Sequence, residues 1–153
     1  MTPIGDILQP DHVNLSLSAA GKTDAVEEVL SKLNGDVRVK DFAAFRKSVI
    51  GRNAAAISES HCGICIAHGR TESVSGLVMA AGRSSAGFSC REVSDPVHLV
   101  FVTGIPGAFN AEYLRILGAI ARICRDKHQL DRLMSAKTAG EFIALLSAGE
   151  VKL

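Results

Sequence analysis

Apolar residues recur at every third or fourth position in the first third of the chain, which is the period of an amphipathic helix. One such stripe lies between Thr23, a good N-cap residue, and the pair Asn34-Gly35, which favours a left-handed helix end. A second stripe predicts a helix over about residues 40–51. Before both helices, apolar and polar residues alternate over residues 12–17, which predicts a short strand. The expected inward side chains of the two helices are Val26, Val29, Leu30 and Leu33, then Phe42, Phe45, Val49 and Ile50.

The middle of the chain carries three short apolar runs in place of helical stripes. Each run is followed by glycine, which is a strong signal for a turn. Short uninterrupted apolar runs that end at such signals are typical of strands buried on both faces of a sheet. The runs cover residues 63–68, 74–81 and 97–102, and the turn signals are Gly69, Gly82-Arg83 and Gly104.

Two further helices are predicted in the last third of the chain. Asn110 is a suitable N-cap for the first, which we expect over about residues 111–127. Thr138 is a suitable N-cap for the second. Helices that alternate with fully apolar strands indicate an α/β fold. We therefore expect one domain over residues 1–153, with a mixed, mostly parallel sheet flanked by helices on both faces. The expected buried face of the helix over 111–127 carries Leu114, Leu117, Ala121 and Cys124.

The charge balance excludes some classes of partner. The chain has 17 Lys and Arg against 16 Asp and Glu, which leaves a formal net charge of +1. This balance gives no general attraction to nucleic acid or to an anionic membrane surface. The sequence has no run of about 18 apolar residues that would form a transmembrane helix, and its start lacks the basic and apolar order of a secretory signal. We expect a cytoplasmic protein without membrane insertion, whose four cysteines are reduced.

His68 is the most prominent chemical group of the apolar runs. It ends one run, and function in α/β sheets gathers at strand ends. The octapeptide over residues 63–70, Gly-Ile-Cys-Ile-Ala-His-Gly-Arg, resembles one branch of the enzyme IIA domains of the bacterial phosphoenolpyruvate-dependent phosphotransferase system. The fructose, mannitol and nitrogen-regulatory members of that branch read Gly-Ile-Ala-Ile-Pro-His-Gly/Ala-Arg/Lys. Arg52 lies sixteen positions before the histidine (68 − 52), as in the family. Residues 96–101 and the helix start at Tyr113-Leu114 also match family segments in order.

The resemblance implies a phosphocarrier. His68 would accept a phosphoryl group from an HPr-like protein and pass it to an enzyme IIB partner, or use it as a regulatory switch. The chain would then be a phosphotransferase that works through a transient phosphohistidine, in sugar transport or in nitrogen regulation. A neutral imidazole suits this role, because its free pKa of about 6.5 leaves it mostly deprotonated at pH 7. The donor is a protein, so no nucleotide, metal or other cofactor is expected.

Five further residues are candidates around that histidine. The guanidinium of Arg52 offers a planar fork of donors to a phosphoryl group, although a charge at a helix end is an equally good interpretation. Tyr113 stands where the family has a second active-site histidine, so it can donate one hydrogen bond but cannot become cationic. His98 lies inside an apolar run, either as a hydrogen-bonded core residue or as a group that orients His68 from a neighbouring strand. The expected apolar partner surface consists of Ile57 and Phe109, together with Tyr113.

Departures from the family pattern support a second hypothesis. Residues 53–62 replace a stretch that the family fills with Gly, Ser and Thr, and Ala67 replaces the proline before the active histidine. Together with Tyr113, these changes favour a regulatory or binding module that keeps the fold with little or no phosphoryl transfer.

A soft-metal site is the weaker alternative for the same segment. His61, Cys62, Cys65 and His68 have the spacing of zinc ligands, but no second Cys/His pair accompanies them. If residues 63–68 form a strand, Cys65 and His68 point to opposite faces and the ligands diverge. We therefore expect no metal.

Overall fold

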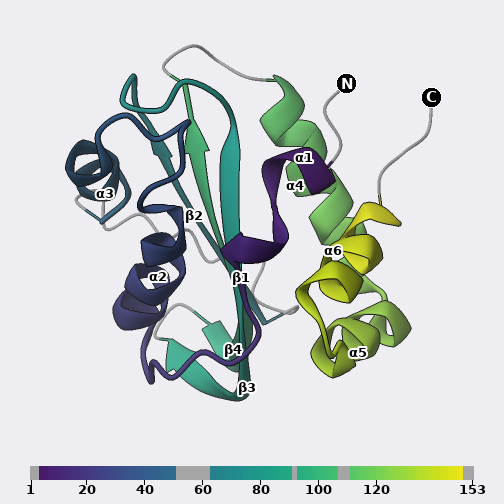
Figure 1. Ribbon diagram of the computed structural model, residues 1–153. Helices are drawn as coiled ribbons and strands as arrows, with labels where there is room; N and C mark the ends of the chain where they lie inside the picture. The colour runs from purple at the N-terminus through teal and green to yellow at the C-terminus, as the bar shows by residue number, and fades with distance from the viewer. Residues whose placement is uncertain (1–3, 51–62, 91–92, 107–110, 150–153) are drawn as a thin grey trace.

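Four strands form one mixed sheet at the centre of the computed structural model, which describes residues 4–50, 63–90, 93–106 and 111–149 (Figure 1). The strand order is β1-β3-β4-β2. β1 is parallel to β3 and β2 is parallel to β4, whereas β3 and β4 are antiparallel. Two of the three pairings are therefore parallel, and the predicted α/β fold is confirmed. The strands are β1 (Val13–Asn14), β2 (Ile64–Arg70), β3 (Val78–Cys90) and β4 (Val93–Ile105).

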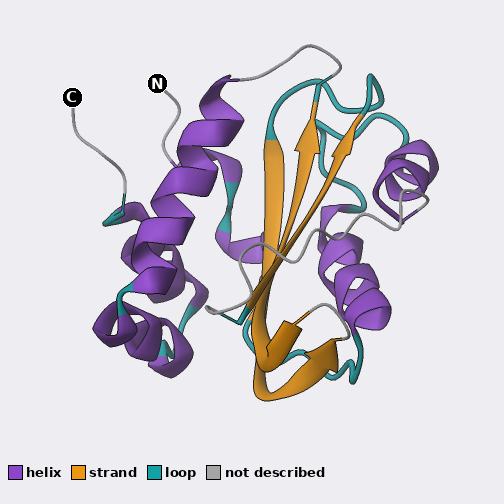
Figure 2. Cartoon of the chain, turned by 180° about the vertical axis from the view of Figure 1, so that it is seen from behind, coloured by secondary structure: helices purple, strands orange, loops and turns teal. Residues whose placement is uncertain are grey.

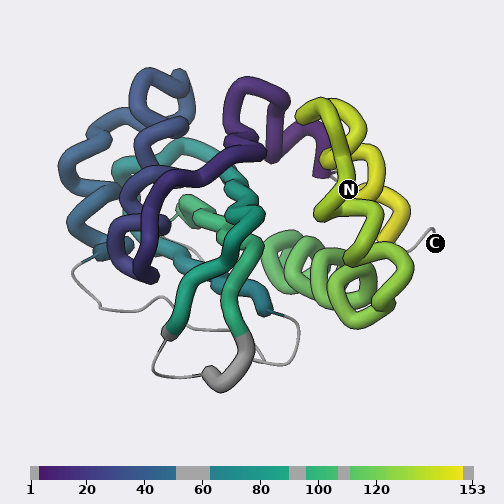
Figure 3. The backbone as a smooth tube through the Cα atoms, turned by 90° about the horizontal axis from the view of Figure 1, so that it is seen from below, coloured from purple at the N-terminus to yellow at the C-terminus, as the bar shows by residue number. Residues whose placement is uncertain are grey.

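Helices cover both faces of this sheet (Figures 2 and 3). α2 (Lys22–Leu30) and α3 (Phe42–Ile50) lie on one face. The other face carries the C-terminal helices together with the short α1 (Ile4–Ile7). The C-terminal helices are α4 (Ala111–Arg125), α5 (Lys127–Ser135) and α6 (Ala139–Ser147), and the two 3-10 turns are η1 (Pro10–His12) and η2 (Ser31–Leu33).

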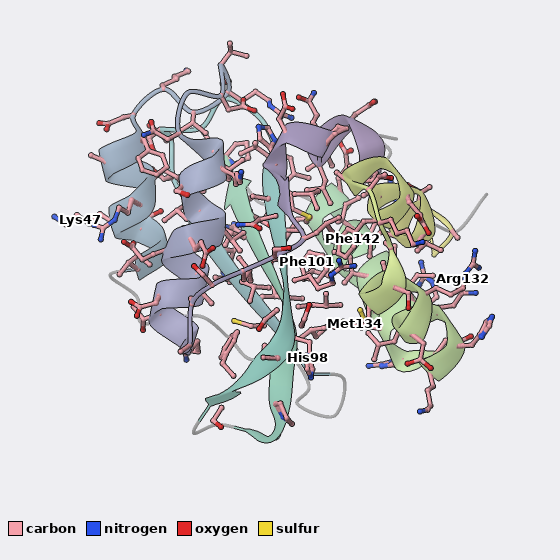
Figure 4. All side chains as sticks on the ribbon, turned by 60° about the horizontal axis from the view of Figure 1, so that its bottom comes forward. Lys47, His98, Phe101, Arg132, Met134 and Phe142 are labelled. Atoms are coloured by element: carbon pink, nitrogen blue, oxygen red, sulfur yellow. The ribbon has the colours of Figure 1, made fainter. Side chains whose placement is uncertain are left out.

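The alternation of side chains along the strands divides the interior into two cores. In β2, Ile64 and Ile66 belong to the core under α4 and α6, while Cys65 and Ala67 belong to the core under α2 and α3. This division follows from the period of two along a strand. Phe101 of β4 and Phe142 of α6, both labelled in Figure 4, belong to the first of these cores.

The predicted end of the second apolar run at Gly82-Arg83 is wrong, because β3 continues to Cys90. Gly82 is a point of close approach in the strand, since a Cβ there would lie 2.5 Å from Cγ2 of Val29. The missing side chain lets α2 pack on the sheet. Arg83 continues the strand and ties it to the opposite helical layer, because its Nη1 donates to the carbonyl oxygens of Leu133 (2.9 Å) and Ala136 (2.8 Å).

The predicted face of the long helix is also corrected. Cys124 is buried as predicted, but Leu114 is 54% exposed, and the buried face of α4 also includes Tyr113, Ile116 and Ile120. The chain offers two overlapping apolar stripes, and the packed stripe lies one residue before the predicted one. The helix ends at Arg125, and α5 follows at once because the carboxylate of Asp126 caps it. Thr138 caps α6, as predicted.

Among the described residues, no helix has both the length and the apolar character that crossing a membrane requires.

A buried ionic cluster fastens the N-terminal segment to the connection between α2 and α3. Nε2 of His12 lies 3.3 Å from Oδ2 of Asp36, and the side chain of Arg38 donates to both oxygens of the same carboxylate. Burial is the largest effect on the pKa of His12 and lowers it. The negative charges of Asp36 and Asp11 raise this pKa, whereas the positive charges of Arg38 and Lys32 lower it further. The hydrogen bonds from Arg38 lower the pKa of Asp36.

The cluster predicts a loss of stability in mild acid. Because the folded-state pKa of His12 lies below its ordinary value of about 6.5, the unfolded chain binds the proton first. The contribution of His12 is therefore fully present above about pH 6.5 and is lost as the pH falls through the folded-state pKa. We expect the free energy of unfolding, measured with urea between pH 7.5 and 5, to fall less steeply in His12→Gln than in the wild type. His128→Gln, on the exposed start of α5, is the control; equal slopes for all three proteins would contradict the expectation.

Candidate functional site

His68 lies near the carboxyl end of β2, on the face of the sheet that α4 covers. Its Cα is paired with that of Thr103 in β4, and both strands run to the same edge of the sheet. Figure 1 shows the N-terminal end of α4 at this edge. By strand alternation His68 follows Ile64 and Ile66 on the α4 side. His68 is half-buried there.

Tyr113, in the first turn of α4, contacts His68. The two ring centroids are 5.8 Å apart and the ring planes are tilted by 50°. This is within the range of favourable aromatic contacts. Burial raises the pKa of Tyr113 to about 12, so its hydroxyl remains a neutral donor at physiological pH. The structure thus brings His68 and Tyr113 together, two of the residues that the sequence singled out. Tyr113 is buried and does not lie on the solvent-exposed side of the helix.

Arg70 is a residue of this site that the sequence analysis missed. It lies two positions after His68, and side chains two apart on a strand share a face. Its positive charge opposes the upward pKa shift of Tyr113, which places the guanidinium within electrostatic reach of the tyrosine hydroxyl. Its side chain is exposed. The sequence signal for Arg70 is the alternation of side chains along the predicted strand, which places residues 68 and 70 on the same face.

Thr103 is the second missed residue. It is fully buried, and its Oγ1 has no hydrogen-bond partner among the described residues. A buried hydroxyl without a partner costs about 1–3 kcal/mol. No local pattern identifies it, because its position beside His68 is set by the pairing of β2 with β4.

The close contact between α3 and β2 lies next to His68. A Cβ on Gly69 would collide with Oγ of Ser48 and would lie 2.9 Å from Cγ2 of Val49, so only glycine permits this approach. α3 ends at Ile50, two residues before Arg52. Arg52 itself lies outside the described residues, as do Ile57 and Phe109 of the expected partner surface.

His98 does not orient His68. In the β2–β4 ladder its neighbour Leu99 is opposite Ile64, so His98 lies five residues, or about 16 Å of strand, before the partner of His68. Nδ1 of His98 donates a hydrogen bond of 2.8 Å to the carbonyl oxygen of Ser84 in β3. Figure 4 places His98 toward the end of the sheet where β3 and β4 join. The structure therefore supports the first interpretation, a hydrogen-bonded histidine within the fold.

The described ligands of the alternative metal site diverge. Cys65 is buried in the core under α2 and α3, whereas His68 faces α4. Within the described part of the chain, no three His, Cys, Asp or Glu residues are grouped so that they would hold a metal ion. His61 and Cys62 lie outside that part.

The arrangement suits covalent chemistry on an anion. A half-buried imidazole is a nucleophile near neutral pH. Among the described residues, the ring of Tyr113 contacts it and carries a neutral donor hydroxyl, and the positive charge of Arg70 acts on that hydroxyl. Donors and positive charge around a nucleophile stabilise the negative charge of a bound or transferred phosphoryl group.

Comparison with known proteins identifies the class. Residues 6–149 match the family model described as "Phosphoenolpyruvate-dependent sugar phosphotransferase system, EIIA 2". The chain belongs to this family, and the resemblance seen in the sequence is confirmed.

The relatives include both sugar-specific and regulatory proteins. The fructose-specific EIIA component of Haloferax volcanii is 28% identical over 139 residues, which cover 90% of each protein. The nitrogen regulatory protein of Bradyrhizobium diazoefficiens is 26% identical over 148 residues and 95% of each protein. The fructose-specific EIIABC component of Bacillus subtilis is 22% identical over 94% of this chain, but the chain spans only 23% of that longer protein.

Solved structures share the fold. The nitrogen regulatory protein IIA-Ntr of Neisseria meningitidis superimposes with a TM-score of 0.78 at 26% identity, over 94% of this chain and 98% of that one. The mannitol enzyme IIA of Escherichia coli, in a complex with phosphorylated enzyme IIB, gives a TM-score of 0.74 at 15% identity, over 93% and 99% of the two chains. At 15% identity, the similarity to the mannitol enzyme IIA shows a shared fold and nothing more.

Proposed function

We propose that the chain is a phosphocarrier that accepts a phosphoryl group on His68 from an HPr-like protein in the cytoplasm. The observation that carries the proposal is the position of His68: half-buried at the carboxyl end of β2, against Tyr113 of α4, in a chain of the enzyme IIA family. Family membership supplies the class of reaction, and the geometry supplies a nucleophile at the sheet edge where such sites gather.

The transfer itself needs no redox partner or metal. One ring nitrogen of His68 attacks phosphorus, the P–N bond to the donor histidine breaks, and a new P–N bond to His68 forms. The second ring nitrogen keeps its proton throughout. The phosphoryl group adds roughly −1.5 to −2 charge beside the ring, which Arg70 on the same strand face is placed to offset. In this proposal Arg52 is a second cation, since α3 ends two residues before it and its last turn packs on Gly69.

The acceptor is either an enzyme IIB protein or a regulatory target. The Escherichia coli relative forms a complex with phosphorylated IIB, and the Neisseria and Bradyrhizobium relatives carry nitrogen-regulatory names. A docking surface would include the exposed Leu114, one residue after Tyr113, together with the proposed contacts Ile57 and Phe109. An apolar patch around the histidine suits a transient protein partner.

A second candidate function is a regulatory or binding module with the same fold and little or no phosphoryl transfer. The specific observation in its favour is Tyr113, whose hydroxyl stays neutral where the family pattern has a group that can become cationic.

Incubation with a phosphorylated HPr-like donor separates the two functions. We expect acid-labile, base-stable label on the wild-type chain, as phosphohistidine requires, and loss of that label when an enzyme IIB protein is added. Label that remains on the chain whichever acceptor is added would favour the regulatory module. Absence of label after prolonged incubation would overturn the phosphocarrier.

The substitution Tyr113→His is expected to raise the rate of phosphoryl acceptance. A histidine there supplies a charge-assisted donor, which is about twice as strong as a neutral one, so we expect a gain of up to about tenfold. Tyr113→Phe is the matched control, because it keeps the ring against His68 and removes only the hydroxyl; it should lower the rate. Unchanged rates of labelling in both variants would place Tyr113 outside the site.

A further inference from the structure

The buried hydroxyl of Thr103, in β4, makes no hydrogen bond to the described residues. Its side chain is fully buried, and Oγ1 has no hydrogen-bond partner among the residues that the structure describes. Most buried hydroxyl groups in proteins are hydrogen-bonded, so one that is not calls for an explanation. The fold gives none, because a valine of the same shape would satisfy the packing without burying a polar atom.

The position of Thr103 supplies the explanation. Thr103 is opposite His68 in the β2–β4 ladder, and paired positions on adjacent strands present their side chains to the same face. The register two residues earlier confirms the shared face, because Ile66 and Phe101 are opposite each other and both belong to the core under α4. The unpaired hydroxyl and the half-buried imidazole are therefore neighbours across one pair of strands.

We propose that Thr103 is a positioning residue for His68. Its Oγ1 accepts a hydrogen bond from the ring nitrogen of His68 that faces β4, which leaves the lone pair on the outward nitrogen. This inference rests on the proposed function of His68 as the phosphoryl acceptor. Oγ1 of Thr103 has no other hydrogen-bond partner among the described residues, so it is available to accept this bond.

The hydrogen bond serves both states of the ring. Before transfer it selects the tautomer whose outward nitrogen is a nucleophile. After transfer the outward nitrogen carries phosphorus, the inward nitrogen still carries its proton, and the ring is more positive. A donor on a charged ring makes a stronger hydrogen bond than one on a neutral ring. Thr103 therefore stabilises the phosphorylated state more than the free state.

Two substitutions separate this role from packing. Thr103→Val keeps the shape and removes the hydroxyl, whereas Thr103→Ser keeps the hydroxyl. The first readout is the tautomer ratio of His68 in the unphosphorylated protein, from the ¹⁵N chemical shifts of the ring. We expect Thr103→Val to increase the population of the tautomer with the proton on the outward nitrogen about fivefold relative to the other tautomer. This factor corresponds to the net free energy of one hydrogen bond. Thr103→Ser should remain at the wild-type ratio.

The second readout is the half-life of the phosphohistidine formed with phosphoramidate, a small donor that needs no docking surface. It should shorten about fivefold in Thr103→Val and recover in Thr103→Ser.

A wild-type tautomer ratio in Thr103→Val overturns the proposal, as does a serine variant that behaves like valine. Failure of the proposed function is distinguishable, because the tautomer ratio is measured without any phosphoryl donor. A chain that the HPr-like donor never labels, but whose ring responds to Thr103→Val, would lose the phosphocarrier role and keep the hydrogen bond.

Discussion

The substitution His68→Gln is expected to abolish acid-labile labelling by a phosphorylated HPr-like donor. Glutamine approximates the length and polarity of histidine, but its amide nitrogen has no lone pair available to attack phosphorus. Because His68 is half-buried near the end of β2 and Arg70 follows it at the surface, the change leaves the two apolar cores intact. Loss of label should therefore occur without loss of the circular dichroism spectrum or of the thermal transition.

The matched control for this experiment is His128→Gln. His128 is exposed in the first turn of α5. Its replacement should leave the labelled fraction unchanged. Label that persists in His68→Gln but disappears after acid treatment would mean that another histidine accepts the phosphoryl group, and the site built around β2 would then be misassigned.

Most of the secondary structure could be predicted from local pattern, but the ends of the strands could not. Gly82 and Gly104 read as turn signals, yet both lie inside strands. At each of them a neighbouring side chain occupies the space a Cβ would need: Val29 at Gly82, and Val78 at Gly104. A glycine that ends a strand and a glycine that admits a helix are identical in sequence, and only the packing partner distinguishes them.

Some residues of the candidate site could likewise be predicted from local sequence patterns, and others could not. His68 and Tyr113 were found because each falls on a recognisable segment, and the structure places their rings in contact. Arg70 required the strand to be continued past Gly69. Thr103 required the register between β2 and β4, which pairs two residues 35 positions apart in sequence (103 − 68) and which no local signal encodes. The two interpretations of His98 stay open in the sequence for the same reason, because the apolar run that contains it does not reveal which of its residues is opposite His68.

The substitution Gly63→Ala is expected to be strongly destabilising, because Gly63 fixes where β2 begins. Its φ of +66° is in the left-handed region, and a Cβ there would lie 2.8 Å from the carbonyl oxygen of Pro96. Its own carbonyl oxygen accepts hydrogen bonds from the backbone N–H groups of His98 (2.9 Å) and Leu99 (3.3 Å), the first links between β2 and β4. Left-handed strain and the forced displacement of β4 together should cost about 2–4 kcal/mol of unfolding free energy, measured with urea.

Gly35→Ala isolates the strain from the collision. Gly35 also has a positive φ, of +98°, but no atom lies within 4 Å of the Cβ position. The variant Gly35→Ala should lose only about 1–2 kcal/mol of unfolding free energy. If the two variants lose equal stability, the close approach to Pro96 contributes nothing. If Gly63→Ala loses more, the excess measures the contact that sets the register of β2. Because that register places His68 opposite Thr103, the folded fraction of Gly63→Ala should also be labelled more slowly by the phosphoryl donor than that of Gly35→Ala.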